Sequence, residues 1–274
     1  MQNNDTFYTC QVHGIPVNIS SLNQALSEVD ILIHSRQHHY VCFFEGNLFS
    51  RALRSNDVKN AIIGASLIYP DGITIAREMK WILKQNVARV SGPSFLLRAC
   101  EYGIKHDWKH FFLGGEEGIA QKLSNDLRVK YPGIKIVGCY TPPFRELTIS
   151  EETELKKQIE ESNADLLWVG LGGPKQEFWM KKHLNVIDIP VMLGVGAAFD
   201  FHSGNRPWAP SLIRKSGFEW LYRMLFGGKR TFFRNIKCTT HLSGVLIADR
   251  INSMFQHAEE KELRVPGLIN STNR

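Results

Sequence analysis

The sequence lacks the features that mark several common protein classes. It contains no run of about 18 consecutive apolar residues, which a membrane-spanning helix requires. Its first ten residues show no basic region followed by an apolar stretch, so we expect no secretory signal. Its five cysteines are odd in number and form no C-x-x-C pair. This usage indicates free thiols in a reducing cytoplasm rather than a disulfide framework or a metal site.

Common catalytic and cofactor motifs are also absent. There is no H-E-x-x-H, no G-x-S-x-G, no G-x-G-x-x-G and no G-x-x-x-x-G-K-[ST]. His34, His38 and His39 have helical spacing, but no carboxylate is suitably placed nearby, so a solvated helix end is the favoured interpretation. We therefore expect neither a bound metal nor a cofactor.

The positive charge is concentrated in one segment. The 274 residues carry a net charge of +6, with 43% hydrophobic and 22% charged residues, an ordinary composition for a soluble protein. Residues 206–237 contain eight Lys or Arg and one acidic residue, a net charge of +7, so the rest of the chain sums to −1. The same segment is rich in aromatic residues. A partner of this segment is expected to be acidic.

The first three-quarters of the chain alternates short apolar runs with amphipathic stretches, which predicts an α/β domain whose mainly parallel sheet is covered on both faces. The expected strands are 12–17, 40–44, 67–69, 111–113, 134–140, 166–170 and 191–195. The expected helices are 22–35, 47–54, 73–83, 93–106, 118–130, 150–161 and 175–184. A change of character near residue 205 predicts two parts: a catalytic domain at 1–205 and a basic, aromatic appendage at 206–274.

Several polar residues follow the expected strands, where an open α/β fold displays its functional groups. Asp71 lies in a Pro-Asp-Gly turn and Asn47 opens a helix, so a turn role and an N-cap role stay open for them. Arg89 lies in a connection, where a plain surface position is the alternative. Gln176 lies in the first helical turn of a Pro-Lys-Gln-Glu motif. Asp200 lies in a third loop at the same expected edge and is a further candidate for substrate binding.

Taken in order, these segments resemble one protein family. The similarity is to the WecG/TagA/CpsF glycosyltransferases, glycosyltransferase family 26, and it extends from about Val12 to Arg234. The motifs that carry it are Pro70-Asp-Gly72, Arg89-Val-x-Gly92, Phe112-Leu-Gly-Gly115, Tyr131-Pro-Gly133, Val169-Gly-Leu-Gly172, Pro174-Lys-Gln-Glu177, Phe199-Asp-Phe201 and Glu219-Trp-Leu-Tyr-Arg223.

The resemblance implies an inverting, metal-independent transfer of a sugar from a UDP-sugar to a lipid-linked acceptor. It implies a Rossmann-like domain with a helical C-terminal appendage that docks on the cytoplasmic, inner face of the membrane and helps to complete the site. Such enzymes build teichoic acid linkage units, enterobacterial common antigen and exopolysaccharides. The oligomeric state stays open, with a homo-oligomer as one alternative.

The resemblance also assigns roles to residues. Asp71 is implied as the general base that takes the proton of the acceptor hydroxyl. Asn47, Arg89 and Gln176 match pocket residues, and Glu45 stands where the family usually has Thr, which puts the identity of the donor sugar in doubt. Because no D-x-D motif is present to hold a metal, arginines are expected to stabilise the leaving diphosphate. These are Arg223, Arg230 and Arg234.

Other functions stay open for the same residues. The basic and aromatic appendage suits an anionic membrane surface, because cations attract acidic headgroups and Trp and Tyr favour the interface. A single-stranded nucleic acid also binds such surfaces, although no nucleic-acid-binding motif is present, and a purely structural helical cap is a further alternative. The unusual Glu45 leaves open a protein that binds a UDP-sugar without turnover.

Overall fold

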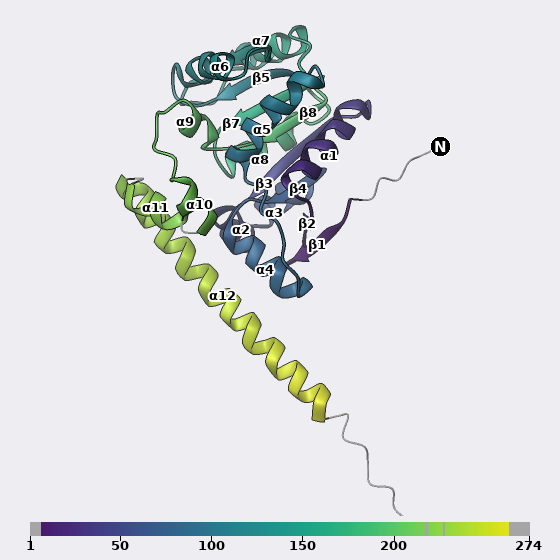
Figure 1. The fold of residues 1–274 in the computed structure, drawn as a ribbon, viewed down its shortest axis with the longest axis vertical. Helices are drawn as coiled ribbons and strands as arrows, with labels where there is room; N and C mark the ends of the chain where they lie inside the picture. Colours follow the sequence, from purple (N-terminus) through teal and green to yellow (C-terminus); the bar gives the residue numbers. More distant parts are fainter. Residues whose placement is uncertain (1–6, 217–218, 227, 263–274) are drawn as a thin grey trace, which may run out of the picture.

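The computed structural model describes residues 7–216, 219–226 and 228–262. A six-stranded sheet lies at its centre, with the order β4-β3-β8-β7-β5-β6 and every neighbouring pair parallel (Figure 1). The strands are β3 (His39–Phe44), β4 (Leu67–Pro70), β5 (Lys109–Gly114), β6 (Lys135–Tyr140), β7 (Leu166–Gly170) and β8 (Val191–Gly194). The predicted α/β fold with a parallel sheet is confirmed.

Helices cover both faces of this sheet. One face packs against α1 (Leu22–His34), α5 (Gly92–Lys105), α6 (Ile119–Lys130) and the short α9 (Ala198–His202). The other face packs against α2 (Gly46–Ala52), α3 (Asn56–Ile63), α4 (Ile73–Leu83), α7 (Ile149–Glu161) and α8 (Lys175–His183). The fold is therefore a three-layer sandwich of the Rossmann-like type.

The sequence of the central strands explains this layering. Along β3, Tyr40 and Cys42 belong to one apolar core, whereas Val41 and Phe43 belong to the core on the opposite face. Successive side chains of a strand point to opposite faces, so a continuous apolar run is what a sheet buried on both sides requires. Each fully buried large side chain contributes roughly 1.5–3 kcal/mol relative to the exposed state.

Polar caps set the starts of several helices. The Ser21 and Thr148 hydroxyls each accept a backbone N–H of the first turn, in capping boxes with Gln24 and Glu151. The Ser91 hydroxyl accepts the backbone N–H of Ser94 at the start of α5, without a reciprocal bond. These caps are local sequence features, and the expected helix starts agree with the structure to within one or two residues.

One expected strand was wrong. Residues 12–17 do not form a single strand, because the chain reverses at His13 and Gly14, which both have positive φ (50° and 75°). The result is an antiparallel hairpin of β1 (Thr9–Val12) and β2 (Ile15–Asn18). A two-residue turn with both φ angles positive matches the twist of the flanking strands.

Two helices lie where none was expected. Helix α3 begins after Ser55, whose hydroxyl accepts the Val58 N–H at 3.4 Å. Helix α9 occupies the segment that we expected to be a loop after β8. Both are short, with eight and five residues, and so carry little periodic signal in the sequence.

The C-terminal segment is helical. It contains α10 (Ser211–Ser216), α11 (Glu219–Phe226) and the long α12 (Gly228–Glu262). Figure 1 shows α12 passing α2 and α4 and then extending beyond the body of the domain. The expected helical appendage is confirmed, and the boundary near residue 205 stays a prediction.

Candidate active site at the ends of β3 and β4

The turns after β3 and β4 are held side by side. The two strands pair in parallel, with Phe44 opposite Pro70. The backbone N–H of Asp71 donates to the carbonyl of Phe44 at 3.0 Å, so the turns continue the pairing of the strands. A Cβ on Gly72 would lie 3.3 Å from the backbone nitrogen of Gly46, so the close approach leaves little space for a side chain. The pairing brings Asp71 next to Glu45.

The carboxyl group of Asp71 is half-buried in the wall of a cavity. Its Oδ2 atom accepts the backbone N–H of Gly92 at 3.3 Å. Burial raises the pKa of Asp71 from 3.8 to about 7, and the nearby carboxylates of Glu219 and Glu45 act in the same direction. The Arg89 guanidinium and the Gly92 N–H oppose this shift. A carboxyl with this pKa exchanges protons near neutral pH, as a general base must.

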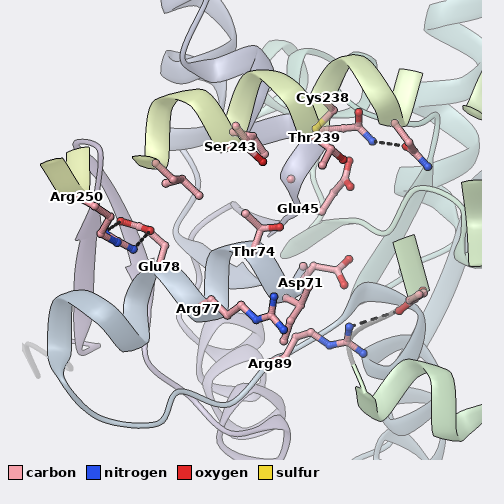
Figure 2. A pocket seen from close by; sticks show the side chains of 18 residues that line it. Glu45, Asp71, Thr74, Arg77, Glu78, Arg89, Cys238, Thr239, Ser243 and Arg250 are labelled. Carbon is pink, nitrogen blue, oxygen red and sulfur yellow. Dashed lines mark hydrogen bonds and ion pairs between the residues drawn. The ribbon is translucent and has the colours of Figure 1, made fainter. Parts of the chain in front are cut away.

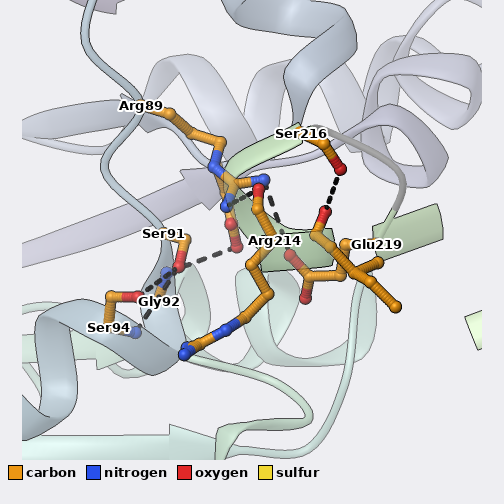
Figure 3. Close-up of polar contacts among 9 residues, drawn as sticks. Arg89, Ser91, Gly92, Ser94, Arg214, Ser216 and Glu219 are labelled. Atoms are coloured by element: carbon orange, nitrogen blue, oxygen red, sulfur yellow. Dashed lines mark hydrogen bonds and ion pairs between the residues drawn. The ribbon is translucent and has the colours of Figure 1, made fainter. Parts of the chain in front are cut away.

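Arg89 connects the domain to the C-terminal segment. It lies in the connection between α4 and α5, and one guanidinium nitrogen is 3.5 Å from the Glu219 carboxylate of α11. A second nitrogen donates to the backbone carbonyl of Arg214 in α10 at 3.2 Å (Figure 3). Its donors are thus divided between α10 and α11, and its charge remains next to Asp71.

Helix α12 forms one wall of the cavity. The cavity has a volume of about 430 Å³ and lies between this helix and the turns after β3 and β4 (Figure 2). From the domain it is lined by Glu45, Gly46, Asn47, Asp71, Gly72, Ile73, Thr74, Arg77, Glu78 and Arg89, and from α11 by Glu219. From α12 it is lined by Asn235, Cys238, Thr239, Leu242, Ser243, Leu246 and Arg250. Without α12 this side of the cavity would be open.

Specific contacts hold α12 in this position. Both carboxylate oxygens of Glu78, which is 3% exposed, accept hydrogen bonds from Arg250 at 2.7 and 3.2 Å. The Arg250 guanidinium also stacks 3.5 Å above the ring of Trp81. At the other end of the cavity, Asn47 donates to the side-chain oxygen of Asn235 at 3.4 Å. Residues from both ends of the cavity therefore anchor the helix.

Two of the expected substrate-binding residues do not line this cavity. Gln176 is buried, and its amide bonds to the Glu177 carboxylate, the Gly194 carbonyl and the Gly196 N–H at 2.8–3.0 Å. Asp200 in α9 accepts from Asn205 and pairs with Arg206 at 3.3 Å. Both lie at the ends of β7 and β8, along the same sheet edge. Their role in substrate binding stays a prediction.

The expected diphosphate-binding arginines fall partly outside the described residues. The backbone of Arg223 belongs to α11, and the backbones of Arg230 and Arg234 belong to the first turns of α12. Their side chains lie outside the described part of the structure.

The sequence analysis missed part of the cavity wall. Arg77 and Thr74 come from α4, and Asn235, Thr239 and Ser243 come from α12. The last three recur every four residues, a helical spacing that marks one polar stripe. That stripe is visible in the sequence, but nothing in the sequence shows that it faces the turns after β3 and β4.

The described residues contain neither a metal-binding cluster nor a membrane-spanning helix. Within residues 7–216, 219–226 and 228–262, no three His, Cys, Asp or Glu side chains are grouped so that they could hold a metal ion. Over this described range no helix has the length and apolar character needed to cross a membrane.

The chain is similar to one family over most of its length. The model of the glycosyl transferase WecG/TagA/CpsF family matches residues 10–256. A Bacillus subtilis protein is 25% identical over 92% of this chain and 96% of its own length, and a Bacillus spizizenii protein is 26% identical over 74% and 76%. A Staphylococcus aureus protein is 29% identical over 61% and 63%. All three are named N-acetylglucosaminyldiphosphoundecaprenol N-acetyl-beta-D-mannosaminyltransferase.

Proposed function

This chain belongs to the WecG/TagA/CpsF family of glycosyltransferases, and we propose that it moves a sugar from a UDP-sugar to a polyprenyl-diphosphate-linked saccharide, with inversion and without a metal. The names of its relatives support a lipid-linked N-acetylglucosamine as the acceptor class and an N-acetylhexosamine as the transferred sugar. The product would enter a cell-surface polysaccharide or exopolysaccharide. The observation that carries the proposal is the carboxyl of Asp71 in the cavity wall, with a pKa of about 7.

The proposed reaction is a single displacement. The Asp71 carboxylate takes the proton of the acceptor hydroxyl, and the hydroxyl oxygen forms a bond to the anomeric carbon of the donor. The bond from that carbon to the diphosphate oxygen breaks, and UDP leaves with the electron pair. Attack and departure on opposite faces invert the anomeric centre, by analogy with inverting glycosidases. One base is sufficient for this step.

The other expected site residues have proposed roles in the same reaction. Arg223, Arg230 and Arg234 would stabilise the negative charge that develops on the departing diphosphate, as guanidinium groups do for phosphates. Asn47 and Glu45 lie beside the base in the cavity wall and would bind sugar hydroxyls. Glu45 accepts hydrogen bonds only, so a Glu in place of Thr would favour a donor or acceptor that offers hydroxyl hydrogens to it.

The appendage is the proposed membrane-binding part. Leu212, Leu225, Phe226 and Phe233 are exposed by 62–80%, and the sequence of the same segment, residues 206–237, contains eight Lys or Arg. Apolar side chains among cations suit the interface of an anionic bilayer. The enzyme would thus work as a peripheral protein on the cytoplasmic face of the membrane, where its acceptor lies.

Liposome binding tests this attachment. The double variant Leu225→Glu/Phe226→Glu should reduce co-sedimentation with phosphatidylglycerol vesicles, and added salt should reduce wild-type binding. Phe144→Glu is the control, because Phe144 is 95% exposed in the catalytic domain. Equal loss of co-sedimentation in the double variant and in the control, or wild-type binding that does not change with salt, would contradict membrane docking by the appendage.

A screen for transfer tests the activity. Purified protein is incubated with individual UDP-sugars and a polyprenyl-diphosphate N-acetylglucosamine, with and without a chelator, and UDP release and product are measured. We expect UDP release that requires the acceptor, survives the chelator and falls at least a hundredfold in Asp71→Asn. UDP-sugar binding without acceptor-dependent release would favour a binding protein, and full activity of the Asn variant would remove Asp71 from the role of base.

A further inference from the structure

Most charged side chains of the cavity wall are already paired. The Glu78 carboxylate is bonded by Arg250, and the Glu219 carboxylate is paired with Arg89. Asp71 accepts the Gly92 N–H. Among the residues that the structure describes, no hydrogen bond or ion pair joins the two remaining charged groups of the wall, Glu45 and Arg77, to each other or to other side chains. Arg77 is therefore a cation of the cavity wall whose guanidinium has no hydrogen-bond or ion-pair partner among the described residues.

Arg77 is placed to reach the reacting part of the cavity. It lies one turn after Thr74 on α4, the helix that begins directly after the Asp71 turn. Figure 2 shows its side chain extending from α4 into the cavity, toward Asp71 and Arg89. The neighbouring carboxylate on the same helix, Glu78, cannot neutralise it because both of its oxygens are bonded to Arg250.

We propose that Arg77 binds a substrate diphosphate in this cavity. The inference rests on the proposed function, in which both substrates carry a diphosphate. A guanidinium group remains protonated at all physiological pH values and presents parallel N–H donors that match two phosphate oxygens. The cavity face that carries Arg77 is opposite α12, so a diphosphate would be held between Arg77 and the C-terminal segment. Arg77 would thus contact the diphosphate from α4, whereas the other proposed phosphate-binding arginines belong to the C-terminal segment.

The diphosphate could belong to the UDP-sugar or to the lipid-linked acceptor, and two probes separate these sources. UDP represents the donor, and farnesyl diphosphate represents the acceptor headgroup with a short prenyl chain. Isothermal titration calorimetry gives the affinity of each probe without requiring turnover. The variants are Arg77→Ala, Arg77→Lys and the control Lys80→Ala, which removes an exposed cation from the same helix outside the cavity wall.

We expect Arg77→Ala to weaken one of the two probes about 10- to 100-fold, the range for losing charge-assisted hydrogen bonds. Arg77→Lys keeps the charge but not the paired donors, so it should fall between Ala and the wild type. Lys80→Ala should stay within about twofold for both probes, since it removes an exposed, solvent-screened charge that does not line the cavity. Weakened UDP binding assigns the site to the donor, and weakened farnesyl diphosphate binding assigns it to the acceptor.

The contrary results are separable from a failure of the proposed function. If the wild type binds a probe and folded Arg77→Ala binds both probes as the wild type does, the inference about Arg77 is wrong while the proposed function stands. If Lys80→Ala weakens probe binding as much as Arg77→Ala does, the loss of affinity reflects the overall positive charge of the helix, and the inference is also wrong. If the wild type binds neither diphosphate, both the inference and the proposed function fail. Thermal denaturation of each variant confirms that it is folded.

Discussion

The pH dependence of transfer tests the environment of Asp71. A base must be deprotonated to act, and burial together with two neighbouring carboxylates raises the pKa of Asp71 to about 7. At pH 8 about nine-tenths of the molecules would carry the carboxylate, and at pH 5 about one-hundredth would. We therefore expect kcat/KM to fall about 100-fold from pH 8 to pH 5. A carboxyl with the ordinary value of 3.8 would give nearly no fall over this range.

The measurement is initial-rate UDP release at subsaturating substrate from pH 5 to pH 9, in buffers of constant ionic strength. Asp71→Asn is the control, because its residual activity should lose this acid limb. A flat wild-type profile between pH 5 and pH 8, or the same acid limb in the Asn variant, would refute the assignment of the raised pKa to an Asp71 base.

The raised pKa of Asp71 also affects folding stability: a rise in pH that activates the base destabilises the folded protein. The folded-state pKa of Asp71 lies above its unfolded value, so the folded protein loses stability as pH rises from about 4 to about 7. Asn resembles the neutral carboxyl, so Asp71→Asn should raise Tm at pH 8 and leave it nearly unchanged at pH 4. The upper limit of this stabilisation is about 4 kcal/mol, from 1.36 kcal/mol per pKa unit, and solvent screening of the partly exposed carboxyl reduces it. A variant that is less stable than the wild type at pH 8 would contradict the unfavourable environment of the carboxylate.

Three further predictions concern the cavity and the sheet edge. Glu45→Gln removes a negative charge beside Asp71 and so lowers the pKa of this proposed base, which should move the acid limb of the pH profile to lower pH. An unmoved limb would show that the two groups do not interact. Arg250→Ala leaves the buried Glu78 carboxylate without its bidentate partner, so the free energy that holds α12 on the domain should fall by about 1–3 kcal/mol and the amides of α12 should exchange faster. Unchanged exchange would contradict this anchoring role. Gly114→Ala would place a Cβ 2.6 Å from the backbone of β7 at φ +130° and should lower the free energy of unfolding by at least about 1–3 kcal/mol. Gly244→Ala is the control, because a Cβ there meets nothing within 4 Å, and this change in α12 should stabilise the protein by up to about 1 kcal/mol. Equal denaturant midpoints of the two variants would contradict the close approach at Gly114.

Much of the fold and part of the site follow from local sequence signals. The apolar run of β7 and the helix at 73–83 occur at the predicted residues, because continuous apolar runs and helical periodicity are encoded within a dozen neighbouring positions. The polar residues after β3 and β4 are brought together as expected, because parallel strands end at one edge of the sheet. The hairpin at His13 was missed, because two consecutive positive φ angles are weakly signalled without an Asn-Gly pair.

The sequence by itself therefore determined the alternation of strands and helices and the position of Asp71 directly after a strand, since both are encoded in short stretches of neighbouring residues. Only the tertiary structure decided which side of the domain α12 covers and which charges remain unpaired in the cavity. Glu78 and Arg250 are 172 positions apart, and no local sequence pattern indicates that the two side chains pair. The same holds for Arg77 and Lys80, two cations of one helix of which Arg77 lines the cavity and Lys80 does not. Pairing and burial are properties of distant segments in contact, so they exist only once the chain has folded.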